Sequence, residues 1–464
     1  MQEKKTDLVL DVNENPKKIS EWFLFAIQHV LAMFVACITV PLITGLPIAP
    51  TIIASGVGTI IYIIATRGKS PVYLSSSFAY ISPMLAALSV GVIAGAVGDN
   101  YQAIMVGMIM VGAVYIGVAI IIRIFGVAWL NKLLPTIVIG PVIMVIGLSL
   151  SSSAINNLTN VNSSDENYNL IYILCGLIAM FATALSAHYG KKTIKLIPFV
   201  IGMCAGYLAA AIFTGIGYHV YGNEYFKIID FSPVIENFST TTIHSFFSVP
   251  DFLFMKNGTS FSANELGEVA LLFIPVAFVT ICEHIGDHKN LSNIIHKDLL
   301  VDPGLDKTLI GDGIATAISG CMCGSANTTY GENVAVIGVS KIASTSVILL
   351  AAIMAICIGF FTPFMVVIET IPVCVTGGVS LILYGFIASS GVKMLIQEHI
   401  DFNKTKNIFI VSVILVAGIG GLTLKFGDPS SPTIEITSIA LAMLLGILLN
   451  IILKDKENTE KIEE

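Results

Sequence analysis

Charged residues are scarce in this chain. Asp, Glu, Lys and Arg make up only 12% of the 464 residues, whereas hydrophobic residues make up 55%. Soluble globular proteins carry about 25% charged residues, because polar side chains must cover their outside. The composition therefore excludes a soluble globular protein. We expect a protein whose solvent is largely lipid, and we expect no nucleic-acid partner.

The chain also lacks closely paired cysteines, and we expect its first residues not to be a secretory leader. None of its eight cysteines forms a CxxC pair, and all lie in apolar segments or at their edges. We interpret them as small core residues, which excludes a disulfide framework and a cysteine zinc site. The first twenty residues are polar, whereas a cleavable signal peptide needs an apolar stretch directly after a short basic one. We predict neither a cofactor nor a resident metal.

Long hydrophobic runs, by contrast, are abundant. A helix that crosses the hydrocarbon of a bilayer needs about 20 apolar residues. Fourteen segments are candidates: 20–44, 48–66, 71–96, 101–121, 133–151, 168–188, 195–218, 267–296, 304–322, 331–345, 346–369, 373–397, 405–421 and 434–453. The sequence therefore predicts an all-α polytopic protein of the cell membrane with fourteen transmembrane segments.

The basic residues favour one side of the membrane. With fourteen spans and a cytoplasmic N-terminus, all Lys and Arg except Lys227, Lys256 and Lys425 fall on the cytoplasmic side, which is 21 of 24. Short cytoplasmic loops are normally rich in these residues. We therefore predict cytoplasmic tails at 1–19 and 454–464, and an external loop at 219–266.

Two spans open unlike ordinary helices. The third begins "SPVYLSSSFAYISPM" at residues 70–84, and the tenth includes "CGSANTTYGENVAV" at residues 323–336. Small polar residues suit non-helical backbone, which is tolerated at membrane depth only inside protein or beside a wet cavity. Each segment is third in its set of seven spans, which indicates two halves inserted with opposite orientation. Paired interrupted spans in an inverted repeat point to the binding site of a transporter.

Ionisable residues inside the spans are the candidate functional groups. An ionised side chain at the bilayer centre costs about 2.5–3.5 kcal/mol, so it is rare without a use. The four strongest candidates are Glu283, Asp287, Asp312 and Glu332, and His29 is a weaker fifth. Glu283 and Asp287 are four residues apart and share one helix face. Glu332 stands where the polar stretch becomes a helix, beside a glycine that permits close approach of a ligand.

The two histidines near Glu283 suggest an alternative. His284 and His288 have helical ligand spacing, but the order of acid and base differs from the HExxH zinc motif and no third ligand is evident. We therefore predict no metal enzyme. His284 is interpreted as a brace inside the bundle. His288, with Lys289, is interpreted as marking the cytoplasmic end of its span.

Several motifs resemble one transporter family. They are "QHVLAMFVA" (28–36), "SSSFAYISPM" (75–84), "EHIGD" (283–287), "KDLLVDPGL" (297–305), "NTTYGENVAV" (327–336) and "GGVSLILYGFIASSG" (377–391). Together they resemble the nucleobase–ascorbate transporter family, most closely its bacterial uracil-transporting members. The resemblance implies a core domain (20–121 and 267–369), a gate domain (133–218 and 373–453), short antiparallel strands in spans three and ten, and a homodimer.

The resemblance also implies roles for single residues. Glu283 and Glu332 match the carboxylates that hold the base, Gly331 and Phe78 match positions that offer backbone groups, and Ala36 lines the pocket. Supporting positions are His284, His29, Ser77 and Asn333.

The resemblance also links proton coupling to the position four residues after Glu283. Uracil transporters often carry His at this position, where Asp287 stands, and Asp312 matches an acid typical of the purine branch. Glu332 matches the uracil branch. The implied function is proton-coupled import of uracil, with xanthine or urate as the alternative and sodium as the alternative ion. An anion exchanger of similar fold is disfavoured by the four buried acids, and an enzyme by the lack of a nucleophile or metal constellation.

Overall fold

A computed structural model describes residues 8–453, apart from 89, 91–100, 160–168, 192, 251, 253–262, 429 and 430. The outer parts of both predicted tails, 1–7 and 454–464, lie outside these residues. So do the end of the predicted third span and much of the second half of the predicted external loop.

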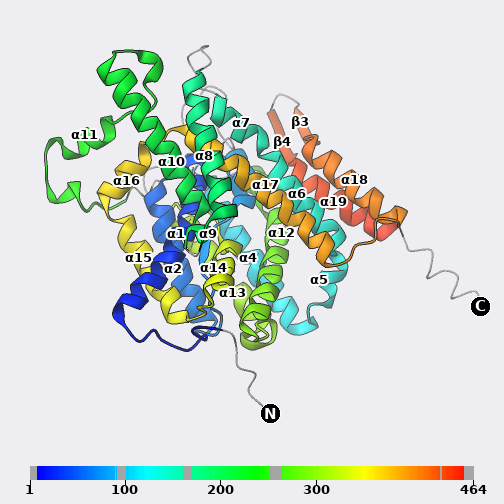
Figure 1. Ribbon diagram of the computed structural model, residues 1–464. Coiled ribbons are helices and arrows are strands. Elements are labelled where there is room, and N and C mark those ends of the chain that lie inside the picture. Colours follow the sequence, from blue (N-terminus) through cyan, green and yellow to red (C-terminus); the bar gives the residue numbers. More distant parts are fainter. Residues whose placement is uncertain are drawn as a thin grey trace, which may run out of the picture.

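Helices dominate the described part of the chain (Figure 1). In chain order they are α1 (Ile19–Thr44), α2 (Ile48–Ala65), α3 (Ile81–Ala87), α4 (Tyr101–Phe125), α5 (Ala128–Leu133), α6 (Thr136–Ser149), α7 (Ser151–Thr159), α8 (Leu170–Tyr189), α9 (Thr193–Leu196), α10 (Pro198–Phe213), α11 (Ser232–Ser239), α12 (Ala263–Ile295), α13 (Leu305–Cys321), α14 (Gly331–Ser340), α15 (Thr345–Gly359), α16 (Thr362–Glu369), α17 (Val373–Gln397), α18 (Thr405–Ile419) and α19 (Ser438–Ile452). Two π-helical turns, η2 (Thr214–Val220) and η6 (Leu300–Gly304), extend α10 and precede α13.

Eight helical segments of the described chain are long and apolar enough to cross a membrane, and four shorter helices are also apolar. The long segments include α1, α2, α4, α8, α12 and α17. Each of the fourteen predicted segments overlaps at least one helix, but the number of spans stays a prediction. Boundaries differ by several residues: α12 begins at Ala263, inside the predicted external loop, and α14 ends at Ser340.

One element was not predicted. A hairpin, in which β3 (Leu424–Asp428) pairs antiparallel with β4 (Ser431–Ile436), occupies the predicted loop between the last two spans and the first three residues of the last span, 434–436. Apolar residues alternate with other residues in both strands, which favours extended chain. The helix that follows begins only at Ser438. The search for runs of about 20 apolar residues did not detect this alternation, because it counts apolar residues without regard to their spacing.

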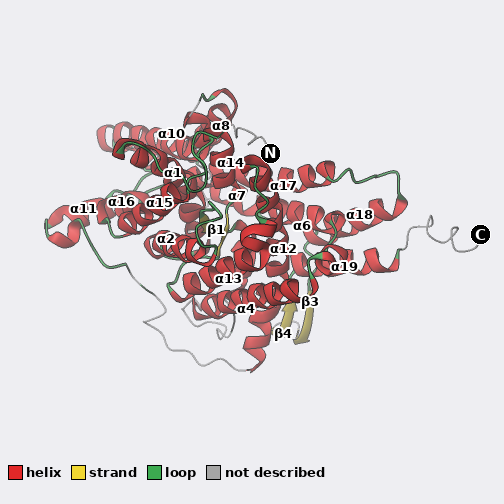
Figure 2. Ribbon diagram, turned by 90° about the horizontal axis from the view of Figure 1, so that it is seen from below, coloured by secondary structure: helices red, strands yellow, loops and turns green. Residues whose placement is uncertain are grey.

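The helices pack in two groups that mix the halves of the sequence. In one, α13 lies against α4 and α2, α12 lies against α4, and α15 lies against α2 and α1. In the other, α17 packs on α6, α7 and α8, while α18 and α19 pack on each other and on α6. Figures 1 and 2 show α18 and α19 at one side of the molecule, opposite α11, α15 and α16.

Small residues bring α4 and α13 together. A Cβ atom at Gly112 would collide with the carbonyl of Gly313, and a Cβ atom at Gly313 would collide with the side chain of Tyr115. Close backbone approach of this kind is a common way to associate helices in lipid, where van der Waals packing replaces the hydrophobic effect. It fixes α13 beside the centre of the molecule.

Two short strands meet near the centre (Figure 2). β1 (Leu74–Ser76) pairs antiparallel with β2 (Asn327–Thr329), so that Leu74 faces Thr329. Neighbouring side chains form hydrogen bonds with strand backbone groups that are not bonded between the two strands. Ser55 donates to the Leu74 carbonyl (2.7 Å), and Thr316 donates to the Asn327 carbonyl (2.5 Å). The strands lie in the two segments whose polar openings set them apart in the sequence.

The beginning of the described chain is tied to the rest of the molecule. Leu10 forms a parallel bridge with Ile342, just after α14. The ammonium of Lys297 lies 2.7 Å from a carboxylate oxygen of Asp11, and Ser344 donates to the Glu14 carbonyl (2.6 Å). Part of the predicted N-terminal tail is therefore docked on the helices.

Candidate functional site

Three carboxylates gather beside the strand pair. Glu283 and Asp287 lie one turn apart on α12, and Glu332 lies in the first turn of α14. All three side chains are partly buried, and each is close enough to another for their charges to interact. Chain folding thus brings together residues 45 to 49 positions apart, on two helices.

The N-terminus of α14 faces this group. The chain leaves β2, passes through Tyr330 in extended conformation (φ −116°, ψ 107°) and turns helical at Gly331, with no side-chain cap. A helix start presents backbone N–H groups and the positive end of a dipole. The donors therefore point into a region that also contains carboxylates, which suits a neutral ligand carrying both donors and acceptors.

Gly331 allows Asp287 to approach this helix start. A Cβ atom at position 331 would lie only 3.1 Å from Oδ1 of Asp287 and 3.4 Å from its Oδ2. The first distance is tighter than ordinary contacts, so a side chain there would displace the carboxylate. The need for glycine at this position is steric, because the residue starts a regular helix.

For the transporter that the sequence predicts, we expect Gly331→Ala to reduce uptake about tenfold, because crowding of a packed site costs about 1–3 kcal/mol. The matched control is Gly338→Ala on the same helix, where the new Cβ would meet only the flexible end of Ile294, at 3.2 Å. Initial uptake rates in vesicles measure both variants. Equal rates for the two would contradict the proposed contact with Asp287.

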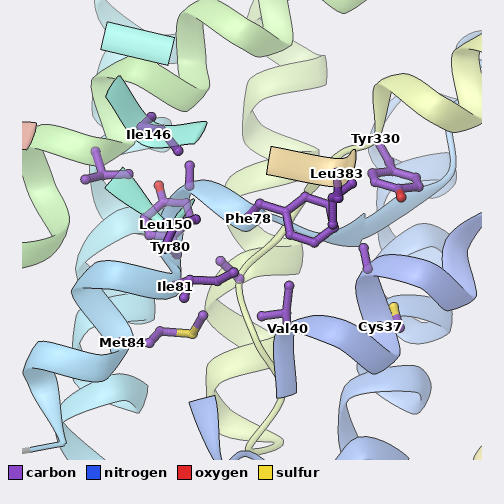
Figure 3. Packing of buried hydrophobic residues seen from close by; sticks show 14 of the residues in the cluster. Cys37, Val40, Phe78, Tyr80, Ile81, Met84, Ile146, Leu150, Tyr330 and Leu383 are labelled. Carbon is purple, nitrogen blue, oxygen red and sulfur yellow. The ribbon is translucent and has the colours of Figure 1, made fainter. Parts of the chain in front are cut away.

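The first strand leads to a similar turn. After β1, Ser77 donates its backbone N–H to the Ala326 carbonyl (2.9 Å), and the 3-10 turn η1 (Phe78–Tyr80) leads into α3. The Phe78 side chain is buried, and Figure 3 shows its ring directed toward Leu383 of α17, near Tyr330. Phe78 thus places a buried aromatic ring directly after β1, in the same hydrophobic cluster as Leu383.

Ala36 is fully buried on α1, in the same hydrophobic cluster as Phe78. The next residue, Cys37, lies 3.3 Å from the hydroxyl of Ser75 in β1. Also on α1, His29 has its Nδ1 2.8 Å from the side-chain oxygen of Asn333, and both residues are buried. These contacts join α1 to β1 and to the first turn of α14.

A fourth acid, Asp312, anchors β2, the strand that leads into α14. Asp312 is fully buried on α13, and its Oδ2 lies 2.7 Å from Nδ1 of His284. Both the backbone N–H and the hydroxyl of Thr329 in β2 donate to the same oxygen, at 3.3 Å. The other ring nitrogen of His284 lies 3.0 Å from the Thr308 hydroxyl. Asp312 and His284 therefore hold β2 two residues before Gly331.

The prediction for His288 is wrong. This residue is fully buried rather than at a helix end, and α12 continues to Ile295. Its Nδ1 lies 2.8 Å from the His284 carbonyl, its Nε2 lies 2.6 Å from the Tyr62 hydroxyl, and its ring stacks on that of His284 at 4.0 Å. The partner Tyr62 lies 226 positions away in the sequence, so local spacing gave no sign of it. Lys289 is exposed, as expected.

The contacts of His288 fix the position of its protons. A carbonyl only accepts, so Nδ1 carries the hydrogen; in neutral imidazole Nε2 then accepts from the Tyr62 hydroxyl. The Tyr62 oxygen in turn lies 2.9 Å from the Ser70 hydroxyl. A chain of buried polar groups thus connects α2 to α12.

We expect Tyr62→Phe to lower the thermal unfolding temperature of the purified protein. It leaves Nε2 of His288 buried without a donor, which costs about 1–3 kcal/mol. The control is Tyr80→Phe: its equally buried hydroxyl lies 2.9 Å from Thr280, which also bonds backbone carbonyls. A melting point for Tyr62→Phe no lower than that of the control would contradict the contact with His288.

Comparison with known proteins identifies the family. A profile described as a permease family matches residues 20–426. A uracil permease of Bacillus caldolyticus is 39% identical over 96% of this chain and 94% of its own length. Those of Bacillus subtilis and Escherichia coli K12 are 38% and 32% identical, over 98% and 97% of this chain and over 96% and 95% of their own lengths. This chain belongs to the nucleobase–ascorbate transporter family. The resemblance of its motifs is thereby confirmed.

The chain is accordingly a permease and not an enzyme, and it is a multi-pass membrane protein. Solved structures support the fold. The transmembrane domain of a cyanobacterial bicarbonate transporter, BicA, superposes with a TM-score of 0.64 at 13% identity, over 95% of this chain and 99% of its own. SLC26A9, whose murine form is described as an anion transporter, gives a TM-score of 0.64 at 12% identity, over 94% of this chain and 66% of its own. At such identities these likenesses concern the fold of the permease alone.

Proposed function

We propose that this permease imports a nucleobase, uracil first, across the cell membrane. The observation that carries the proposal is the convergence of Glu283 and Glu332 on the start of α14, beside the strand pair. The uracil permeases to which the chain is similar, over nearly its full length, support the same substrate. Ring N–H groups need acceptors and ring carbonyls need donors, and this site offers both.

The proposed binding mode assigns each group a partner. The carboxylates of Glu283 and Glu332 accept the N–H groups of the base, while backbone N–H groups at Gly331 and Phe78 donate to its carbonyls. Ala36 closes the pocket from α1. His284, His29, Ser77 and Asn333 support these positions through the contacts described above. A site of this kind rejects analogues that lack a donor, because a buried carboxylate would be left unpaired.

Transport is proposed to be coupled to protons and to work by alternating access. Asp287 is the first candidate for the coupling group and Asp312 the reserve. The proposed framework has fourteen spans in two inverted sets of seven, with a core (20–121 and 267–369), a gate (133–218 and 373–453), and a homodimer as the assembly. The two helix groups support the division into core and gate, since each combines helices from both halves of the sequence.

A purine such as xanthine or urate is the second candidate substrate. The acids at Asp287 and Asp312 favour it, because they resemble the purine branch of the family. An anion is the third candidate, supported only by the fold shared with bicarbonate and anion transporters. Acidic side chains at the site disfavour an anion, since like charges repel.

A competition experiment separates these substrates. Purified permease in vesicles takes up radiolabelled uracil, with and without an inward proton gradient, in the presence of unlabelled uracil, xanthine, urate or bicarbonate. We expect uracil to compete best and the gradient to drive accumulation. Competition by xanthine alone would assign the permease to the purine branch. Uptake that requires sodium and does not depend on the proton gradient would show that sodium is the coupling ion.

The proposed topology has a direct test. Thr241 is exposed in the predicted external loop, and Glu398 is exposed after α17 on the predicted cytoplasmic side. With the eight native cysteines replaced, we expect Thr241→Cys to react with a membrane-impermeant thiol reagent in intact cells. Glu398→Cys is the control and should react only after permeabilisation. The reverse pattern would invert the orientation.

A further inference from the structure

A groove lies at the end of α4, away from the carboxylates. Its volume is about 390 Å³, and it is bounded by the last turn of α4, by α12 and by η6. Its apolar lining includes Ile122, Ile285 and Val301, and its charged lining consists of Arg123, Lys289 and Asp306. Gly126, where α4 ends with φ +76°, also borders the groove, and a Cβ atom there would meet nothing within 4 Å.

Both cations of the groove are available for a ligand. Arg123 stands in the last turn of α4, and both Arg123 and Lys289 are exposed. Within the part of the chain that the structure describes, neither forms an ion pair. A guanidinium offers several donors in a fixed fork that fits phosphate oxygens, and a lysine adds a compact charge.

The surroundings of the groove are those of a membrane interface. Next to Arg123, Ile124 and Phe125 are 66% and 73% exposed, and Val301 on the opposite wall is 77% exposed. In a multi-pass membrane protein such apolar side chains face acyl chains. The following short helix α5 carries Trp129, a residue enriched at the depth of the lipid headgroups. Two cations beside exposed apolar side chains and a tryptophan fit the depth at which a phosphate meets its acyl chains.

We propose that this groove binds the phosphate headgroup of an anionic phospholipid. Arg123 and Lys289 hold the phosphate, while Ile122, Ile285 and Val301 contact the glycerol and the upper acyl chains. The leaflet rests on the proposed topology, which makes it the cytoplasmic one. Basic pockets between transmembrane helices on this side are known to take such headgroups.

Asp306 determines the preferred charge of the lipid. Two cations and one carboxylate give the groove a net charge of +1. A singly charged headgroup such as that of phosphatidylglycerol balances this charge, whereas an additional phosphate would meet the carboxylate. The groove is therefore suited to a monoanionic lipid.

The test measures lipid binding without any transport substrate, so its failure is distinct from a failure of the proposed function. Purified permease in neutral detergent is titrated with phosphatidylglycerol or phosphatidylcholine, and bound lipid is counted by native mass spectrometry. We expect Arg123→Gln and Lys289→Gln each to weaken phosphatidylglycerol binding about fivefold, since each basic residue near a lipid surface contributes about 1 kcal/mol. Arg123→Lys keeps the positive charge, so it should bind phosphatidylglycerol nearly as well as the original chain. This variant replaces Arg123→Gln as the test if Arg123→Gln folds poorly.

Asp306→Asn tests the proposal by the direction in which lipid affinity changes. Removal of this carboxylate should tighten phosphatidylglycerol binding, whereas an interaction with lipids outside the groove would not change. The matched control is Lys132→Gln, an exposed cation on α5 that does not line the groove. An equal loss for Lys132→Gln, no gain for Asp306→Asn, or equal binding of phosphatidylcholine would each overturn the proposal. Displacement by millimolar inorganic phosphate would assign the site to a free anion instead and would also overturn it.

Discussion

Replacement of Glu332 by glutamine should abolish uracil uptake or shift the preference of the permease toward a purine. The carboxylate lies in the first turn of α14, where it interacts with Glu283 across the proposed pocket. A hydrogen bond to a charged group contributes about 1.5–3 kcal/mol, so its loss should reduce uracil uptake about a hundredfold. The amide keeps the size of the side chain but turns one of its two acceptors into a donor, which opposes an N–H group of the base.

The measurement is initial uptake of radiolabelled uracil and xanthine in vesicles with equal amounts of inserted protein. Glu369→Gln is the matched control, because Glu369 is an exposed acid at the end of α16. We expect the control to transport like the original chain. Unchanged uracil uptake by Glu332→Gln would remove Glu332 from the site, and a gain for xanthine would show that this position distinguishes the two branches.

The proposed site residues could be selected from the sequence because ionisable side chains are rare in membrane spans. Ionisable groups are costly in lipid, so Glu283, Asp287, Asp312 and Glu332 stand out against an apolar background. Polar openings likewise marked the segments that hold β1 and β2. These signals are local, and each is visible without knowledge of what lies opposite in space.

The supporting contacts were not accessible in the same way. The bond between His288 and Tyr62 joins α12 to α2, and single-sequence spacing contains no information on such pairs. One sign was present on α2, where Ser55, Thr59 and Tyr62 recur at helical spacing and are all buried. A buried polar stripe in a span predicts a polar partner but does not name it.

The hairpin of β3 and β4 was missed for a different reason. Most of its residues lie in the loop predicted between the last two spans, and only 434–436, which apolar residues follow directly, were assigned to the last span. Only their alternation separates them from a helix, and the strands are five and six residues long. Docking of the chain around Leu10 was equally hidden, because the bridge to Ile342 is made by backbone atoms, which every residue carries.

Asp287→Asn should uncouple transport from the proton gradient more than it weakens binding. Asp287 lies one turn from Glu283, and its charge interacts with those of Glu283 and Glu332. Three carboxylates around one partly buried site repel one another when all are ionised. A base that donates N–H groups to Glu283 and Glu332 selects their ionised forms. We therefore propose that the accompanying proton resides on Asp287.

The asparagine variant keeps the shape of the side chain against Gly331 but carries no exchangeable charge. We therefore expect it to bind uracil and to exchange it in counterflow at rates within about threefold of the original chain, since most of the binding contacts remain. Accumulation driven by an inward proton gradient should disappear. Counterflow and gradient-driven uptake, measured side by side in the same vesicles, separate the two effects.

Asp312→Asn is the informative comparison, because the two acids differ in their surroundings. Asp312 is fully buried and accepts hydrogen bonds from Thr329 of β2, beside His284. Its replacement should disturb the strand pair itself, and therefore reduce counterflow and driven uptake together. Asp287, by contrast, is partly exposed, and no hydrogen bond holds it to β2 in the described part of the chain. If Asp287→Asn retains full accumulation while Asp312→Asn loses accumulation alone, the proton resides on Asp312 and the assignment to Asp287 fails.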